Sequence, residues 1–288
     1  AFGEPVYLSQ LGKVLKLEDS GFWTIDKRYL NFDGFLTAPW TPELIELIGE
    51  PRDANRGLPF SSFKSAAVSD ADRRWADLAA SVQTLLEYAL LHTARKLREQ
   101  TGEKNLCFAG GVAMNCVANT RLLKESGFEK LYIPVEPGDG GASIGAAFAG
   151  YYEKCAKPEK APVYPVFLGA KGNAIEDLLE HIDVEHSWEY HKHDSEADER
   201  LWTWEKVKER GALAEAVARE IRDGRVVGLF RDRFEIGPRA LGHRSILFRP
   251  DSIELAERVS QQIKDRAAFR PYALAIKEEH ASEVLELE

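Results

Sequence analysis

The clearest pattern along the chain is a stripe of apolar residues between positions 70 and 98. These residues recur at spacings of three and four, the period of one face of an α-helix. We predict a long helix over Asp70–Arg98, buried along Trp75, Leu78, Ala79, Val82, Leu85, Leu86, Ala89, Leu90 and Leu97. Thr101-Gly102 follows, and a glycine at this place is typical of a helix end.

Short apolar runs then alternate with helical patterns as far as position 155. We predict strands over Asn105–Phe108 and Lys130–Val135, and helices over Val112–Lys124 and Ala142–Cys155. This alternation is typical of β-α-β units. Both strand-to-helix junctions are rich in glycine.

A second domain is predicted after a change in amino-acid composition near position 157. Three prolines (Pro158, Pro162, Pro165) precede a charged, tryptophan-rich segment, which indicates a linker. A helix over Ala212–Arg222 and a strand over Val226–Phe230 follow. We therefore predict one domain over 1–165, a linker over 166–210 and a second domain over 211–288.

Composition narrows the classes of function. A chain of 288 residues with 44% apolar content can bury one large core or two ordinary ones. A net charge of −9 argues against nucleic acid or an anionic membrane as a partner. Cys107, Cys116 and Cys155 form no CxxC pair, and no apolar run or signal segment indicates export, so we expect a cytoplasmic protein. The oligomeric state stays open.

Two glycine-rich turns are candidate binding sites. In Ala109–Asn115, glycines let a ligand approach the backbone, and the following helix offers free N–H groups to a nucleotide phosphate. Plain chain connectivity explains such a turn as well. In Glu136–Gly145, the carboxylate of Asp139 suits a hard cation. The alternative is that Asp139 is an ordinary helix-cap or turn residue.

A third candidate is a cluster of positive charge in an otherwise acidic chain. Gly237–Ser245 is followed by Lys264–Arg266 and Phe269–Pro271. Guanidinium and ammonium groups that converge suit phosphate or carbamate oxygens. A solvated helix face explains Lys264 and Arg266 fairly well, whereas it fits Arg239 and Arg244 poorly, because these two lie in a Gly/Pro loop.

The remaining residues of interest indicate no further chemistry. His186, His191 and His193 cluster loosely in the charged linker, without a familiar zinc spacing, and favour an exposed loop. No Gly-x-Ser-x-Gly elbow is present, so covalent catalysis is not predicted.

Taken together, these segments resemble the O-carbamoyltransferases that modify nodulation factors, cephamycins and aminoglycosides. The resemblance runs from the first residue to about Ala275. Its most specific motifs are the Ala-Gly-Gly-Val-Ala block at 109–113 and the Gly-Pro-Arg-Ala-Leu-Gly block at 237–242; the others are Ala1–Pro5, Gly49–Arg52, Asp77–Gln83, Gly138–Gly145 and Ile263–Pro271.

The resemblance implies an α/β fold: the C-terminal part of an actin/Hsp70-like, threonylcarbamoyl-transferase-like domain, followed by part of a YrdC-like α/β domain. It implies ATP-dependent transfer of a carbamoyl group from carbamoyl phosphate, through carbamoyl adenylate, to a hydroxyl of a small-molecule acceptor. ATP and a divalent metal would be required, with iron expected and magnesium as the other candidate.

The resemblance also implies roles for individual residues. Those expected to contact the nucleotide are Gly110, Gly111, Asn115, Arg244 and Ser245, and the metal ligand is Asp139. The cations expected to act on carbamoyl phosphate or its adenylate are Arg239, Lys264 and Arg270, with Arg244 and Ser245 beside them.

The sequence departs from the family pattern at both ends: the first phosphate-binding hairpin of the actin-like fold is expected upstream of Ala1, and the rest of the YrdC-like domain beyond Glu288. The family supplies a His-x-x-x-His metal pair from an N-terminal region, and both ends of this sequence read as cut. Asp139 is then left with too few ligands, and we expect little or no transferase activity from this chain alone. Two alternatives stay open: a tRNA threonylcarbamoyl transferase-like enzyme and a non-catalytic nucleotide-binding module.

Overall fold

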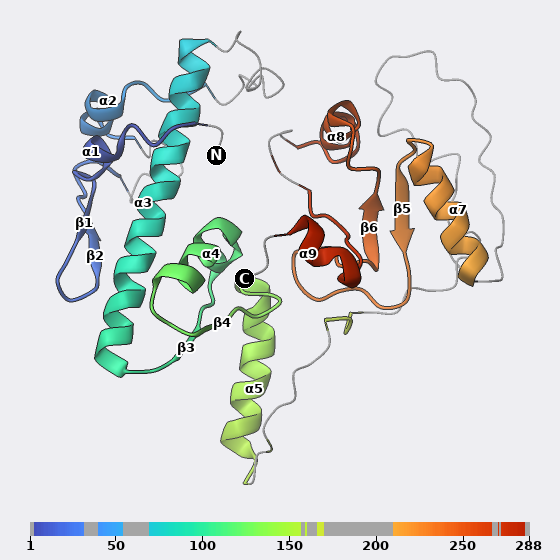
Figure 1. Cartoon of the computed structure of the whole chain (residues 1–288). Coiled ribbons are helices and arrows are strands. Elements are labelled where there is room, and N and C mark those ends of the chain that lie inside the picture. The colour runs from blue at the N-terminus through green and yellow to red at the C-terminus, as the bar shows by residue number, and fades with distance from the viewer. Residues whose placement is uncertain are drawn as a thin grey trace, which may run out of the picture. The chain divides into compact units, whose positions relative to one another are not determined.

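The computed structural model describes residues 3–31, 40–53, 69–156, 159, 166–169, 210–266, 270 and 272–285. The chain divides into two compact units. The first is Ala1–Pro158 with Asp265–Pro271, and the second is Glu159–Lys264 with Tyr272–Glu288. Each unit combines helices with a few short strands (Figure 1), so the mixture of helix and sheet expected from the sequence is confirmed.

Helix α3 (Asp70–Thr101) is the element on which the rest of the first unit packs, and it confirms the longest predicted helix. It begins at Ser69, whose side chain accepts a hydrogen bond from the backbone N–H of Asp72. It ends at Gly102, which adopts a left-handed conformation with φ of 69°. No described helix combines the length and the apolar character needed to cross a membrane.

The N-terminal elements pack along α3, and the turn between β1 and β2 reaches its second half, where Thr93 Oγ1 donates to the carbonyl of Gly21 at 2.9 Å. They are α1 (Leu8–Leu11), the antiparallel pair β1 (Leu15–Leu17) and β2 (Trp23–Ile25), and α2 (Pro42–Ile48). Leu11, Val14 and Leu44 are buried here together, in contact with Leu78 and Leu85 of α3. Burying such side chains contributes about 1.5 to 3 kcal/mol each, which fixes these short elements to the helix.

The second half of α3 covers a β-α-β unit, as predicted. Strands β3 (Asn105–Cys107) and β4 (Lys130–Tyr132) pair in parallel, and Leu106 lies opposite Leu131. Helix α4 (Cys116–Glu125) connects them. The buried cluster between these elements and α3 contains Leu91, Ala94, Leu122 and Phe128.

Three details of the prediction for this unit are wrong. The helix predicted over Val112–Lys124 is interrupted, because a 3-10 turn η2 (Gly111–Met114) comes first and α4 begins only after Asn115. The strand predicted to reach Val135 ends at Tyr132. Val82 and Leu97, placed in the buried stripe of α3, are exposed (52% and 41%).

The last part of the first unit is a short 3-10 turn and a helix. Turn η3 (Asp139–Gly141) leads into α5 (Ala142–Lys154), which confirms the predicted helix. None of the α5 side chains is buried.

The second unit is built on a β-hairpin. Strands β5 (Val227–Phe230) and β6 (Arg244–Leu247) pair antiparallel, with Leu229 opposite Ser245. The other elements are α7 (Arg210–Arg222), α8 (Ile253–Arg258), the π-helical turn η5 (Val259–Ile263), the 3-10 turn η6 (Glu278–His280) and α9 (Ala281–Val284). Helix α7 and strand β5 match the predicted helix and strand.

Most of the predicted linker lies outside the described residues, as do its three histidines. Residues 166–169, which the prediction assigned to that linker, hydrogen-bond to the second unit. The carbonyl of Val166 accepts from the N–H of Ile236 (2.7 Å), and the N–H of Gly169 donates to Phe234 (3.0 Å).

Candidate functional site

In the first unit, the structure brings the two predicted glycine-rich loops together. The N–H of Gly110 donates to the carbonyl of Pro137 at 2.7 Å, which joins the loop after β3 to the loop after β4. Gly110 has φ of 101°, a conformation that other residues rarely adopt. A Cβ atom at Gly110 or Gly111 would meet open space within 4 Å, so the backbone here is accessible to a ligand.

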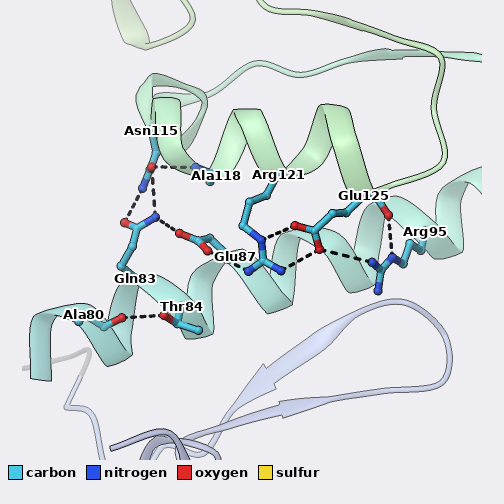
Figure 2. Close-up of polar contacts among 9 residues, drawn as sticks. All are labelled: Ala80, Gln83, Thr84, Glu87, Arg95, Asn115, Ala118, Arg121 and Glu125. Carbon is cyan, nitrogen blue, oxygen red and sulfur yellow. Dashed lines mark hydrogen bonds and ion pairs between the residues drawn. The ribbon is translucent and has the colours of Figure 1, made fainter. Parts of the chain in front are cut away.

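Asn115 acts within the protein as a helix cap. Its Oδ1 accepts from the N–H of Ala118 (3.2 Å) at the start of α4. Its amide also pairs with that of Gln83 on α3, through bonds of 2.8 and 3.2 Å (Figure 2). Contact between Asn115 and a nucleotide stays a prediction. In the structure this side chain positions the turn after Gly111.

The Gln83–Asn115 pair continues into a chain of polar contacts that the sequence reasoning missed. Gln83 donates to Glu87 (2.7 Å), and Arg121 binds Glu87 (2.9 Å) and, through two further bonds, Glu125 (2.6 and 2.8 Å). Figure 2 shows this network between α3 and α4. Pairing with Glu125 and then Glu87 raises the pKa of Arg121, so the guanidinium stays charged.

One sequence signal could have revealed this network. Glu87 lies four residues after Gln83 and four before the buried Leu91, so the helical period places its carboxylate on the packed face of α3. A carboxylate in that position requires a partner, because burying an unpaired charge costs several kcal/mol (about 3 to 5).

Asp139, the predicted metal ligand, is exposed at the start of η3. Within the described ranges, no group of three or more His, Cys, Asp or Glu side chains could hold a metal ion. One carboxylate alone does not satisfy the coordination of a hard or borderline cation. The residues described therefore do not fit a metal by themselves.

Glycines are needed for packing at one place in the Asp139 loop. A Cβ added to Gly141 would lie 2.0 Å from the carbonyl oxygen of Glu136, whereas one added to Gly145, four residues on in α5, would touch nothing within 4 Å. We expect Gly141→Ala to destabilise the unit by about 1 to 3 kcal/mol, since the loop must move. Gly145→Ala should instead stabilise it by up to about 1 kcal/mol through helix propensity. Urea unfolding of both variants tests this, and equal shifts would contradict the close approach at Gly141.

In the second unit, the loop Gly237–Ser245 closes around a buried carboxylate. Glu235 Oε1 accepts from the N–H groups of Leu241 and His243, both at 2.7 Å. Its side chain is 0% exposed, and Arg244 Nε lies 3.3 Å from Oε2. Arg244 Nη2 in turn donates to the carbonyl of Gly237. Glu235 thus fixes both the path of this loop and the guanidinium of Arg244.

The charge of Glu235 is maintained by its surroundings. Burial alone would raise the pKa of this carboxyl, but the hydrogen bonds from the N–H groups of His243 and Leu241 outweigh that effect and lower it to about 2. Sequence reasoning missed Glu235. The available signal was an acid two residues before a Gly-Pro-Arg turn in a locally basic segment.

The structure places the other predicted site residues of this region as follows. Ser245 Oγ accepts from the N–H of Gly242 (3.1 Å), so it helps to hold the same loop. Arg239 and Lys264 are exposed, and neither forms an ion pair within the described part of the chain. Arg270 is exposed and belongs to the first unit rather than the second. Arg239 therefore lies in the loop between β5 and β6, and Arg244 and Ser245 are the first two residues of β6, which follows it.

Comparison with known proteins assigns a family. The sequence matches the model described as carbamoyltransferase N-terminus over residues 55–148 and that described as carbamoyltransferase C-terminus over residues 218–288. The two matches include the Gly110, Asp139 and Arg239 loops.

Relatives among curated proteins agree with this. An uncharacterised protein of Synechocystis is 32% identical over 100% of this chain and 43% of its own length. The nodulation protein NolO of Bradyrhizobium diazoefficiens is 32% identical over 81% of this chain and 37% of its own length, and NolNO of Sinorhizobium fredii is 32% identical over 81% and 30%. The chain thus spans less than half the length of these relatives. With both family models matched in order, the chain belongs to the carbamoyltransferase family.

Proposed function

We propose that this chain contributes to the ATP-dependent transfer of a carbamoyl group from carbamoyl phosphate to a hydroxyl of a small-molecule acceptor. Carbamoyl phosphate, water and ATP would give carbamoyl adenylate, with release of phosphate and pyrophosphate. The acceptor oxygen would then attack the carbamoyl carbon, lose its proton and expel AMP. Adenylation would activate the carbamoyl group, because a carbamate is a poor electrophile until AMP becomes its leaving group.

The observation that supports this proposal best is the loop held by Glu235. Arg239 in this loop is exposed and forms no ion pair with the residues that the structure describes, and Arg244 is oriented by Glu235. A rigid loop that presents cations binds phosphate or carbamate oxygens without a large cost in ordering. Carbamoyl phosphate carries both kinds of oxygen.

The first unit would bind the nucleotide. Its accessible backbone at Gly110 and Gly111, followed by a helical turn, suits phosphate oxygens. In this proposal the first unit is part of an actin/Hsp70-like domain and the second is part of a YrdC-like domain. A divalent metal would need ligands in addition to Asp139.

The proposal predicts that Arg239→Ala weakens the binding of carbamoyl phosphate about tenfold or more, since a charge-assisted hydrogen bond is worth about 1.5 to 3 kcal/mol. Isothermal titration of the purified chain with carbamoyl phosphate measures this. Arg219→Ala is the matched control, because it removes the same charge from the exposed surface of α7. Unchanged affinity in Arg239→Ala would contradict the assignment of this loop.

The same titrations separate the alternative functions. A carbamoyltransferase unit should respond both to ATP and to carbamoyl phosphate. A nucleotide-binding module that has lost its catalytic role should bind ATP only, and that result would count against the proposal.

A further inference from the structure

A cavity of about 520 Å³ lies between α2 and the first half of α3. This volume is within the range of small-molecule sites, about 300 to 1,000 Å³, and exceeds the dry cavities of about 150 Å³ that packing defects leave. Its walls are mainly apolar and include two indole rings; the residues that matter below are Trp40, Leu44, Ile48, Trp75, Ala79 and Val82. Val82 and Ala79, unexpectedly exposed for an apolar stripe, face this space.

Two polar side chains, those of Arg52 and Gln83, are among the residues that line the cavity. Arg52 lines it, and the Nε of Arg52 is buried without a hydrogen-bond partner in the described part of the chain. A buried N–H without a partner costs about 1 to 3 kcal/mol, which an incoming acceptor oxygen would recover. Gln83 also lines the cavity, but its amide already binds Glu87 and, as Figure 2 shows, Asn115, so Arg52 is the side chain that offers a donor to a ligand.

We propose that this cavity binds a small molecule with a flat apolar body and one anionic or strongly hydrogen-bond-accepting group, held by Arg52. The indoles and aliphatic side chains would cover the apolar body, and a charge-assisted bond to the guanidinium would orient it. Gln83 lines the cavity and binds Asn115 next to the loop of Gly110, and on this proximity we assign the ligand as the hydroxylated acceptor of carbamoyl transfer, an assignment that rests on the proposed function.

Two fluorescent probes test the cavity without any activity assay. Anilinonaphthalene sulfonate has an aromatic body and an anionic group, and phenylnaphthylamine has the same body without the charge. Ala79→Phe should fill the cavity and weaken both probes by about tenfold or more, since burial of the rings contributes most of the affinity. Arg52→Gln should weaken only the sulfonate, by about tenfold. Ala218→Phe, on the exposed surface of α7, is the control and should leave both affinities unchanged.

Each outcome decides the proposal. Loss of both probes in Ala79→Phe, together with loss of the preference for sulfonate in Arg52→Gln, supports it. Probes that do not bind, or that respond equally to Ala79→Phe and Ala218→Phe, overturn it, because the space is then filled by another part of the protein or is not specific. If the probes bind as expected while carbamoyl phosphate does not bind the Arg239 loop, the cavity remains a ligand site and only its role as acceptor site is lost.

Discussion

Glu235→Ala is expected to destabilise the second unit by about 2 to 3 kcal/mol, since it removes hydrogen bonds to a charged group and leaves Arg244 without its partner. The loop that carries Arg239 would lose the group on which Leu241, His243 and Arg244 converge. Urea unfolding measures the loss of stability, and limited proteolysis at the loop measures its opening.

Glu235→Gln separates the two functions of this carboxylate. A glutamine oxygen can still accept from the N–H groups of Leu241 and His243, but it brings no charge to Arg244. We expect intermediate stability, with carbamoyl phosphate binding weakened through Arg244. Glu254→Gln, an exposed acid in α8, serves as control. Full stability and full binding in Glu235→Ala would show that the loop is held by other contacts.

The same carboxylate predicts how stability depends on pH. Its pKa is about 2 in the folded protein against an ordinary value of 4.5, so the folded state favours the charged form. Its stabilising contribution should be fully present above pH 4.5 and lost as the pH falls toward 2. Between these values, the stability of wild type should fall more steeply than that of Glu235→Gln, and parallel curves would contradict this.

Arg121→Ala is expected to cost the first unit about 2 to 3 kcal/mol, because Glu87 would remain buried without its cationic partner. Glu87 has a side chain that is only 8% exposed, whereas Arg121 is 28% exposed, so solvent screening reduces the effect from that of a fully buried pair. Thermal or urea unfolding gives the change in stability.

Two controls make this prediction specific. Arg121→Lys keeps the charge but cannot bind both carboxylates with a planar fork, so it should recover only part of the loss. Arg95→Ala removes an exposed guanidinium that contacts the same Glu125, and should cost less than about 1 kcal/mol. If Arg95→Ala were as destabilising as Arg121→Ala, burial of Glu87 would not be the cause.

The fold of each unit could be predicted where periodicity was long. Helix α3 repeats its apolar spacing over many turns, and α5 and α7 lie where the sequence predicts helices. The break at Asn115 was missed because the apolar pattern runs through it, whereas the Asn115 side chain caps α4 by accepting from the N–H of Ala118. Val82 was placed in the core because spacing indicates a face of the helix, not what covers it.

The candidate site could be predicted only in part. Glycines and arginines are visible in a sequence as motifs, and Gly110, Arg239 and Arg244 were found in this way. Glu235 and Gln83 act through partners that are distant in the sequence or belong to the backbone, such as the N–H of His243, and spacing does not reveal such partners. Positioning residues of this kind require a three-dimensional description.

The hydrogen bond between Gly110 and Pro137 has a consequence for how this family can vary. Because the bond fixes one point of each loop against the other, an insertion in one of them displaces the anchor of its neighbour. We therefore expect the lengths of the two loops to change together in evolution.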